Sequence, residues 1–128
     1  MLDRGDATSV IDDAWDAVEQ KTRLPEQLEA FLASRGPTPL HFDSRRAFHR
    51  FFMRNKAILE RRESRFAVYT KDISRQGIGI LTPVQLLPKE RVQLRLANGT
   101  DYSLEIARCR RVDVGCYECG TRFVLQAQ

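Results

Sequence analysis

The amino-acid sequence predicts a mainly β protein: a six-stranded antiparallel β-barrel with an N-terminal α-helical extension. Apolar and polar residues alternate in several segments, most clearly in 91–96, as they do in strands with one buried face. Short turn sequences separate these segments, and Asn98-Gly99 is the clearest hairpin signal among them. Six strands in a chain of 128 residues would leave unpaired edges, so a closed or nearly closed barrel is expected.

Residues near the N-terminus predict helices rather than strands. Thr8 and Ser9 offer side-chain oxygens that can cap a helix over residues 10–19. Apolar residues recur along this segment at the helical spacing of three to four positions. The resulting stripe consists of Ile11, Trp15 and Val18.

A second helix is predicted over residues 24–36, because Pro25 suits a first turn and Gly36 followed by proline ends a helix. Its apolar stripe consists of Leu24, Leu28, Phe31 and Leu32. Two prolines then make a stiff linker. We therefore expect a helical extension and linker over residues 1–40 and a β-barrel domain over residues 41–128.

The two apolar stripes need a surface to cover them, since two short helices cannot bury both stripes by themselves. We expect them to pack on the barrel or on a second copy of the chain. The alternative is a protein partner bound through these helices, and it stays among the expected partners.

The barrel strands are predicted from alternation and from turn residues. They cover 52–60, 65–71, 77–81, 91–96, 102–112 and 117–125. Turns near 61–64, 98–99 and 113–115 connect neighbouring strands, and residues 82–88 form a loop.

Charge is unevenly distributed along the chain. Residues 1–40 hold 4 Lys and Arg against 8 Asp and Glu, a net charge of −4, and residues 41–128 hold 17 against 9, a net charge of +8, which together give +4. A basic body favours an anionic partner, and nucleic acid, a membrane surface or a phosphorylated small molecule all fit. The sequence has no apolar run of membrane-spanning length and no signal-peptide pattern, so we expect a cytoplasmic protein without membrane insertion.

A polar step interrupts two strand-like runs at Asp72-x-Ser74-x-x-Gly77. Asp72 and Ser74 are two residues apart, so on an extended backbone their side chains point to the same face. Gly77 permits a tight turn or a positive φ and lets a ligand approach the backbone. The alternative interpretation is an Asx-turn in which Asp72 bonds the amide of Ser74 or Arg75.

An arginine motif precedes this step in the segment Ser44-Arg45-Arg46-Ala47-Phe48-His49-Arg50, which carries the spacing Arg-x-x-x-Arg. The two motifs, in this order, resemble those of the PilZ domain, and the resemblance covers roughly residues 41–126. PilZ domains are receptors for the bacterial second messenger cyclic di-GMP. The resemblance therefore implies a PilZ-type β-barrel that acts as a cyclic di-GMP-binding receptor or effector in bacterial signalling.

The resemblance also implies roles for individual arginines. Arg46 and Arg50 are the arginine motif, and Arg45 is the extra basic residue that often precedes it. An arginine fork matches the O6 and N7 acceptors of guanine and makes charge-assisted bonds to phosphate. We assign these arginines to guanine edges and phosphates, and we expect the ligand to order the arginine segment over the barrel.

Asp72, Ser74 and Gly77 are the second motif in the same resemblance. Asp72 and Ser74 are assigned to the donor edge of guanine, and Gly77 allows close approach. Arg75 can add a phosphate contact, although no motif position requires it.

Two other functions fit the residues. One is a PilZ module that binds only protein; the other is a small basic nucleic-acid-binding barrel, which Phe48, Phe51 and Phe52 between the arginines would suit. Asp72 argues against nucleic acid, because it puts a carboxylate where phosphate would pass. Ser74 has no histidine in its motif and no other nucleophile–base pair is recognisable, so we expect neither an enzyme nor a cofactor.

The cysteines raise the question of a metal site. Cys116-x-x-Cys119 has metal-ligand spacing and Cys109 could be a third ligand, but a structural zinc site needs four. The two histidines, His41 and His49, are distant in sequence. Three cysteines are an odd number for a disulfide framework, so we expect reduced thiols and no metal.

Overall fold

The computed structural model describes residues 4–37 and 50–124, and the side chains of these ranges from Ile11 onward. Within these ranges two helices precede seven strands. The helices are α1 (Arg4–Ala17) and α2 (Leu28–Leu32). The strands are β1 (Phe51–Phe52), β2 (Lys56–Arg61), β3 (Ser64–Ile73), β4 (Ile78–Thr82), β5 (Arg91–Leu96), β6 (Asp101–Asp113) and β7 (Cys116–Phe123).

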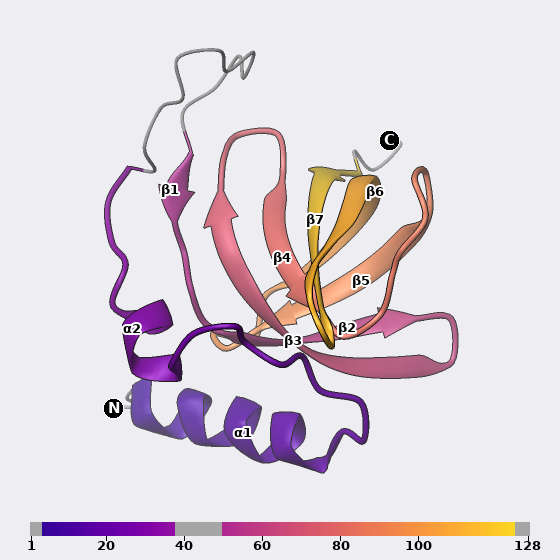
Figure 1. Ribbon diagram of the computed structural model, residues 1–128. Coiled ribbons are helices and arrows are strands. Elements are labelled where there is room, and N and C mark those ends of the chain that lie inside the picture. Colours follow the sequence, from indigo (N-terminus) through magenta and orange to yellow (C-terminus); the bar gives the residue numbers. More distant parts are fainter. Residues whose placement is uncertain (1–3, 38–49, 125–128) are drawn as a thin grey trace.

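Six of the strands in the described chain close into an antiparallel barrel (Figure 1). Their hydrogen-bonded order is β3-β2-β5-β6-β7-β4, and a further pairing of β4 with β3 closes the ring. The short strand β1 pairs with the end of β3, where Phe52 lies opposite Asp72. The mainly β class and the barrel predicted from alternation and turns are confirmed.

β3 is the strand on which the two ends of the ring meet. It pairs with β2 from Ser64 to Tyr69 and with β4 from Tyr69 to Ile73. Its register with β4 shifts between Thr70 and Asp72, which marks a β-bulge at this point. A bulge adds one residue to one strand and re-aims the side chains that follow it. The bulge therefore sets the direction of Asp72, at the end of β3.

The barrel interior is filled by the apolar residues of the alternating strands. In β5 every second residue is buried, as the sequence pattern predicted. The core consists of Ala57, Leu59, Phe66, Val68, Ile78, Ile80, Leu86, Val92, Leu94, Leu96, Leu104, Ile106 and Cys119. This packing fixes the barrel wall, and with it the positions of the polar side chains on its outer surface.

The N-terminal helices cover part of the outer wall, below the barrel in Figure 1. Trp15 and Phe31 pack against Tyr69, with ring centres 5.2 and 5.6 Å apart, and Trp15 Nε1 donates to the Val68 carbonyl at 2.8 Å. Ile11 is buried in the same cluster. Apart from Leu28, which is exposed, the stripes thus pack on the barrel of their own chain, which is one of the two coverings expected. Neither helix in the described ranges is long and apolar enough to cross a membrane.

The predicted helix boundaries are wrong in both helices. α1 begins at Arg4, so Thr8 and Ser9 lie inside the helix instead of capping it, and Val18 lies beyond its end. A capping bond is worth only about 1 kcal/mol, so longer helical hydrogen bonding outweighs it. α2 begins at Leu28, not at residue 24.

Pairing with the barrel explains why α2 is so short. The amides of Thr22 and Arg23 donate to the Ala67 and Gly115 carbonyls at 2.9 and 3.0 Å, which keeps the chain before α2 extended. After α2, the carbonyl of Gly36 accepts from the amide of Phe52 at 2.8 Å. Backbone bonds to β3, to the β6–β7 turn and to β1 therefore hold the chain on both sides of α2.

The first predicted strand, 52–60, is also interrupted, because residues 53–55 separate β1 from β2. The hydroxyl of Thr70 donates to the Met53 carbonyl at 2.5 Å and accepts from the Asn55 amide at 3.0 Å. One side chain thus holds both ends of the interruption. The remaining strands begin and end within a few residues of their predicted limits, and all three predicted turns are present.

Arg54, in this interruption, joins β1 to α2. Its guanidinium carbon lies 4.4 Å from the ring centre of Phe31 and 4.5 Å from that of Phe52. Burial lowers the pKa of Arg54, and the carboxylate of Glu26, 3.7 Å away, opposes this shift. A cation between two aromatic faces is a favourable contact, so α2 and β1 are held together at this point.

Candidate functional site

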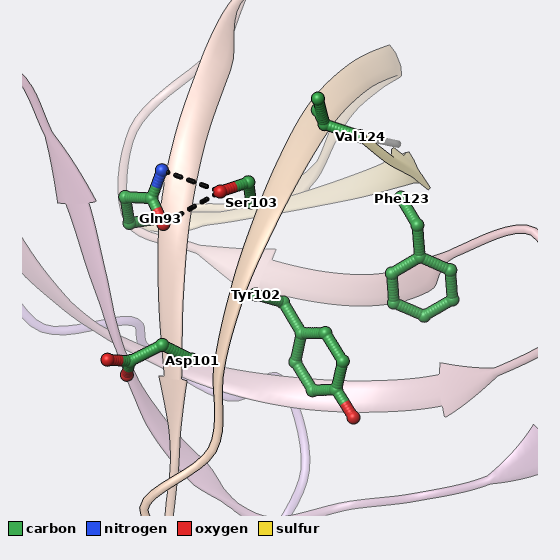
Figure 2. A pocket seen from close by; sticks show the side chains of 6 residues that line it. All are labelled: Gln93, Asp101, Tyr102, Ser103, Phe123 and Val124. Carbon is green, nitrogen blue, oxygen red and sulfur yellow. Dashed lines mark hydrogen bonds between the residues drawn. The ribbon is translucent and has the colours of Figure 1, made fainter. Parts of the chain in front are cut away.

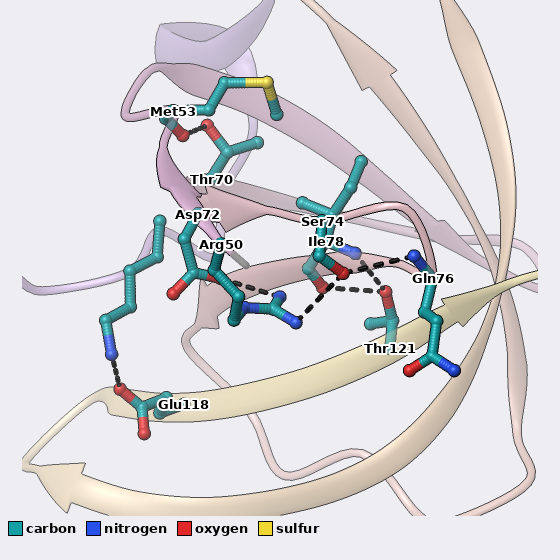
Figure 3. A network of polar contacts seen from close by, with 10 residues as sticks. Arg50, Met53, Thr70, Asp72, Ser74, Gln76, Ile78, Glu118 and Thr121 are labelled. Carbon is teal, nitrogen blue, oxygen red and sulfur yellow. Dashed lines mark hydrogen bonds and ion pairs between the residues drawn. The ribbon is translucent and has the colours of Figure 1, made fainter. Parts of the chain in front are cut away.

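The end of the arginine motif and the Asp-x-Ser-x-x-Gly step meet on the outer wall of the barrel (Figure 3). Arg50 donates from Nε to Oδ1 of Asp72 at 2.9 Å, and its Nη2 lies 2.7 Å from the same oxygen. Its Nη1 donates to the hydroxyl of Ser74 at 3.3 Å. Arg50 is 22 positions from Asp72 and 24 positions from Ser74 in the sequence, yet the three side chains form one polar cluster.

The carboxylate of this cluster is well shielded from solvent. The Asp72 side chain is 7% exposed and that of Arg50 is 16% exposed. A largely buried carboxylate needs a counter-charge, and the guanidinium of Arg50 supplies it. The pair is thus a fixed, oriented part of the wall rather than a solvated surface contact.

Gly79 makes room for this pair. It lies opposite Asp72 in the β3–β4 register, and a Cβ built on it would fall 2.3 Å from Asp72 Oδ1. Any side chain at this position would displace the carboxylate. The sequence analysis missed Gly79 as a site residue, although a glycine inside a strand is a recognised sign of close approach by another group.

The turn between β3 and β4 is built around Ser74. Its amide donates to the Gly77 carbonyl at 2.9 Å, and its hydroxyl accepts from the amide of Gln76 at 3.1 Å. The expected alternative, an Asx-turn made by Asp72, is replaced by a turn closed by serine. The hydroxyl of Ser74 thus serves the turn and Arg50 together (Figure 3).

Gly77 has a structural role that the sequence analysis did not assign to it. Its φ is not positive, and a Cβ built on it would fall 1.8 Å from the carbonyl oxygen of Thr121. Glycine is therefore required for backbone contact with β7 rather than for a special turn conformation. Thr121 secures the same place, since its hydroxyl accepts from the Ile78 amide at 3.1 Å and donates to the Ile78 carbonyl at 2.7 Å.

A second group of charged side chains, formed by Lys71, Arg110 and Glu118, lies beside the cluster. Lys71 and Arg110 both contact the carboxylate of Glu118, Arg110 at 3.0 Å. Burial by itself raises the pKa of Glu118, but the hydrogen bonds and charges of Lys71 and Arg110 outweigh it and hold that pKa below its ordinary value. Glu118 is therefore ionised at neutral pH, and its single negative charge is shared by two cations that are both held in ion pairs.

The predicted site residues fall into three groups. Arg50, Asp72 and Ser74 come together in the polar cluster, and Gly77 supports it from behind. Arg75 is exposed in the turn. Arg45 and Arg46 lie outside the described residues, as do Phe48, His41 and His49.

The cysteines lie in two separate environments. Cys119 is in the barrel core and Cys116 is in the outer cluster under the helices, on opposite faces of β7. Burial raises the pKa of Cys116 to about 11 and also raises that of Cys119, so both stay protonated at neutral pH. The Cys-x-x-Cys spacing therefore does not place two thiolates around one ion.

A separate hollow of about 560 Å³ lies at another part of the barrel (Figure 2). It is lined by Gln93, Asp101, Tyr102, Ser103, Phe123 and Val124. Gln93 and Ser103 bond to each other, and Asp101 is bonded to Arg95. The hollow contains no residue of either motif, and the side chains of Gln93, Ser103 and Asp101 are already paired, so we place the candidate site at the polar cluster instead.

A small closed barrel with an arginine–carboxylate–hydroxyl cluster on its wall is an arrangement that suits a binding module. The family model for the PilZ domain matches residues 44–128, a stretch that contains both motifs. The chain belongs to the PilZ domain family, which is a family of cyclic di-GMP-binding proteins whose domains are binding modules rather than enzymes. A search of curated proteins found no similar sequence.

Proposed function

We propose that this protein is a cyclic di-GMP receptor in bacterial second-messenger signalling. The observation that carries the proposal is the position of Arg50, whose guanidinium joins the arginine motif to Asp72 and Ser74. Family membership makes cyclic di-GMP the first ligand to consider. The joined motifs supply a place where its bases and phosphates can bind.

Arg50 is pre-oriented for such a ligand. Its contacts to Asp72 and Ser74 engage at most three of the five N–H groups of a guanidinium. Among the residues that the structure describes, the other two N–H groups have no partner, and we assign them to a guanine edge or a phosphate oxygen. Arg45 and Arg46 supply further guanidinium groups in the proposed complex, and Arg75 adds charge beside the turn.

Asp72 and Ser74 serve the donor edge of guanine in the proposed complex. The two contacts between Arg50 and Asp72 both use Oδ1 of the carboxylate. We assign the other oxygen, Oδ2, to the N1–H and N2–H donors of the base. A carboxylate that orients an arginine and accepts from the base discriminates guanine from adenine, which lacks those two donors.

Ligand binding becomes a signal when it changes what another surface can contact. In our proposal cyclic di-GMP orders the arginine segment over the barrel. Arg50 leads directly into β1, and β1 is joined to α2 through Arg54 and Phe31. This connection supports a path from the ligand to the N-terminal helices, where a protein partner would detect the change.

Calorimetric titration tests the proposal. Wild-type protein should bind cyclic di-GMP, and Arg46→Ala should lower the affinity about 5- to 150-fold, because one arginine–guanine contact is worth about 1–3 kcal/mol. Arg62→Ala removes the same charge from the exposed β2–β3 turn and serves as the matched control. Wild-type protein that gives no binding heat with cyclic di-GMP would contradict the proposal.

A further inference from the structure

Four residues on four adjacent strands form one row across the outer wall. Asp72 lies opposite Gly79, Gly79 lies opposite Gly120, and Gly120 lies opposite Arg108. Paired residues of antiparallel strands project to the same face of a sheet. The row therefore presents two polar side chains with two bare glycines between them.

Both polar ends of the row reach over the glycines. A Cβ on Gly79 would lie 2.3 Å from Asp72 Oδ1 and 3.6 Å from Nη2 of Arg50. A Cβ on Gly120 would lie 3.3 Å from Nε of Arg108. Facing residues on neighbouring strands are about 5 Å apart, so Arg50 and Arg108 are both within reach of one dinucleotide placed over the glycine pair.

Arg108 differs from the other arginine on its face of β6. Arg110, on the same face of β6, is bound to Glu118. Arg50, at the other end of the row, is neutralised by Asp72. Arg108 is exposed and has no hydrogen-bond or ion-pair partner among residues 4–37 and 50–124. The row thus carries one uncompensated positive charge, and it lies at the end opposite the motif residues.

We infer that Arg108 is a further ligand-binding residue, which contacts a phosphate of the bound dinucleotide from the β6 side of the glycine pair. This inference rests on the proposed function. Arg50 and Asp72 engage the base and an adjacent phosphate, and Arg108 supplies the net positive charge that the neutralised motif pair lacks. The absence of side chains at Gly79 and Gly120 lets the ligand lie close enough to be shared.

Titration with cyclic di-GMP of wild type, Arg108→Ala, Arg108→Lys and Arg111→Ala tests this inference. Arg108→Ala should bind cyclic di-GMP about tenfold more weakly than wild type, because it loses a charge-assisted contact to phosphate. Arg108→Lys should keep most of the affinity, since lysine also binds phosphate as a point charge. Arg111 is exposed on the same strand, and its side chain lies on the other face. Arg111→Ala therefore changes the net charge equally and should bind like wild type.

The outcomes separate the inference from the proposed function. If wild type binds and Arg108→Ala binds as tightly as Arg111→Ala, the role of Arg108 is overturned and the receptor function stands. If wild type does not bind cyclic di-GMP, both fail. Equal losses in Arg108→Ala and Arg111→Ala would indicate a general charge effect and would also overturn the specific contact. Circular dichroism and thermal melting of each variant establish that the barrel is folded.

Discussion

Replacing Asp72 with alanine should lower the affinity for cyclic di-GMP at least tenfold. The substitution removes the oxygen that holds Nε and Nη2 of Arg50 at 2.9 and 2.7 Å, and it removes the proposed acceptor for the guanine donors. Arg50 would then be a partly buried cation without its counter-charge, free to turn away from the site. Loss of orientation and loss of a direct contact thus act in the same direction, which makes this the largest expected effect on binding.

Asp72→Asn and Asp101→Ala sharpen that experiment. Asparagine keeps the shape and one acceptor but loses the charge, so we expect an affinity between those of wild type and Asp72→Ala. Asp101→Ala removes an exposed carboxylate that contacts Arg95 beside the hollow, away from the motifs, and should leave binding unchanged. Calorimetry on all three variants would exclude our assignment if Asp72→Ala bound as tightly as Asp101→Ala.

Gly77→Ala should destabilise the fold by about 2–4 kcal/mol. Its Cβ would fall 1.8 Å from the carbonyl oxygen of Thr121 and 3.0 Å from Cα of Arg122, so backbone must move. The movement would separate the β3–β4 turn from β7 and strain the bonds between Thr121 and Ile78. Urea unfolding, followed by the fluorescence of the buried Trp15, measures the change in the free energy of unfolding.

Gly120→Ala is the matched control for this effect on stability. The three heavy atoms nearest to its Cβ would all belong to the side chain of Arg108, at 3.3 to 3.9 Å, and an exposed arginine can move aside. We expect a change within about 1 kcal/mol of wild type. Equal stability of Gly77→Ala and wild type would show that the turn tolerates a side chain and that Gly77 is not needed for packing.

Much of the barrel could be predicted from the sequence, because its signals are local. The alternation in residues 91–96 follows directly from one buried and one exposed face. Asn98-Gly99 and Gly115 mark turns that the structure contains, and both glycines have positive φ. These features depend on near neighbours in sequence, which is why they can be recognised without knowing the rest of the fold.

The helix limits and the broken first strand could not be predicted, because distant residues determine them. Thr22 is held extended by bonds to strands β3 and β4, and Thr70 interrupts the strand at Met53 and Asn55. Local propensity contains no information about these partners. Tertiary contacts override it wherever backbone groups find a partner on another element.

The candidate site shows the same division. Arg50, Asp72 and Ser74 could be selected from motif spacing, but their direct contact could not. Gly79 gave only the general signal of a glycine inside a strand, and Gly120 and Arg108 could not be selected, because their common row depends on the register of strands β4, β7 and β6. Register between strands far apart in sequence is set by the closed barrel as a whole.

The position of the ligand is tested most directly by amide chemical-shift changes in ¹H–¹⁵N spectra during titration with cyclic di-GMP. Our account predicts that the largest changes occur at Arg50, Asp72 and Ser74, and that they extend along the row to Gly79 and Gly120. Changes centred instead on Tyr102 and Phe123, with the motif amides unaffected, would place the ligand in the separate hollow and contradict the account.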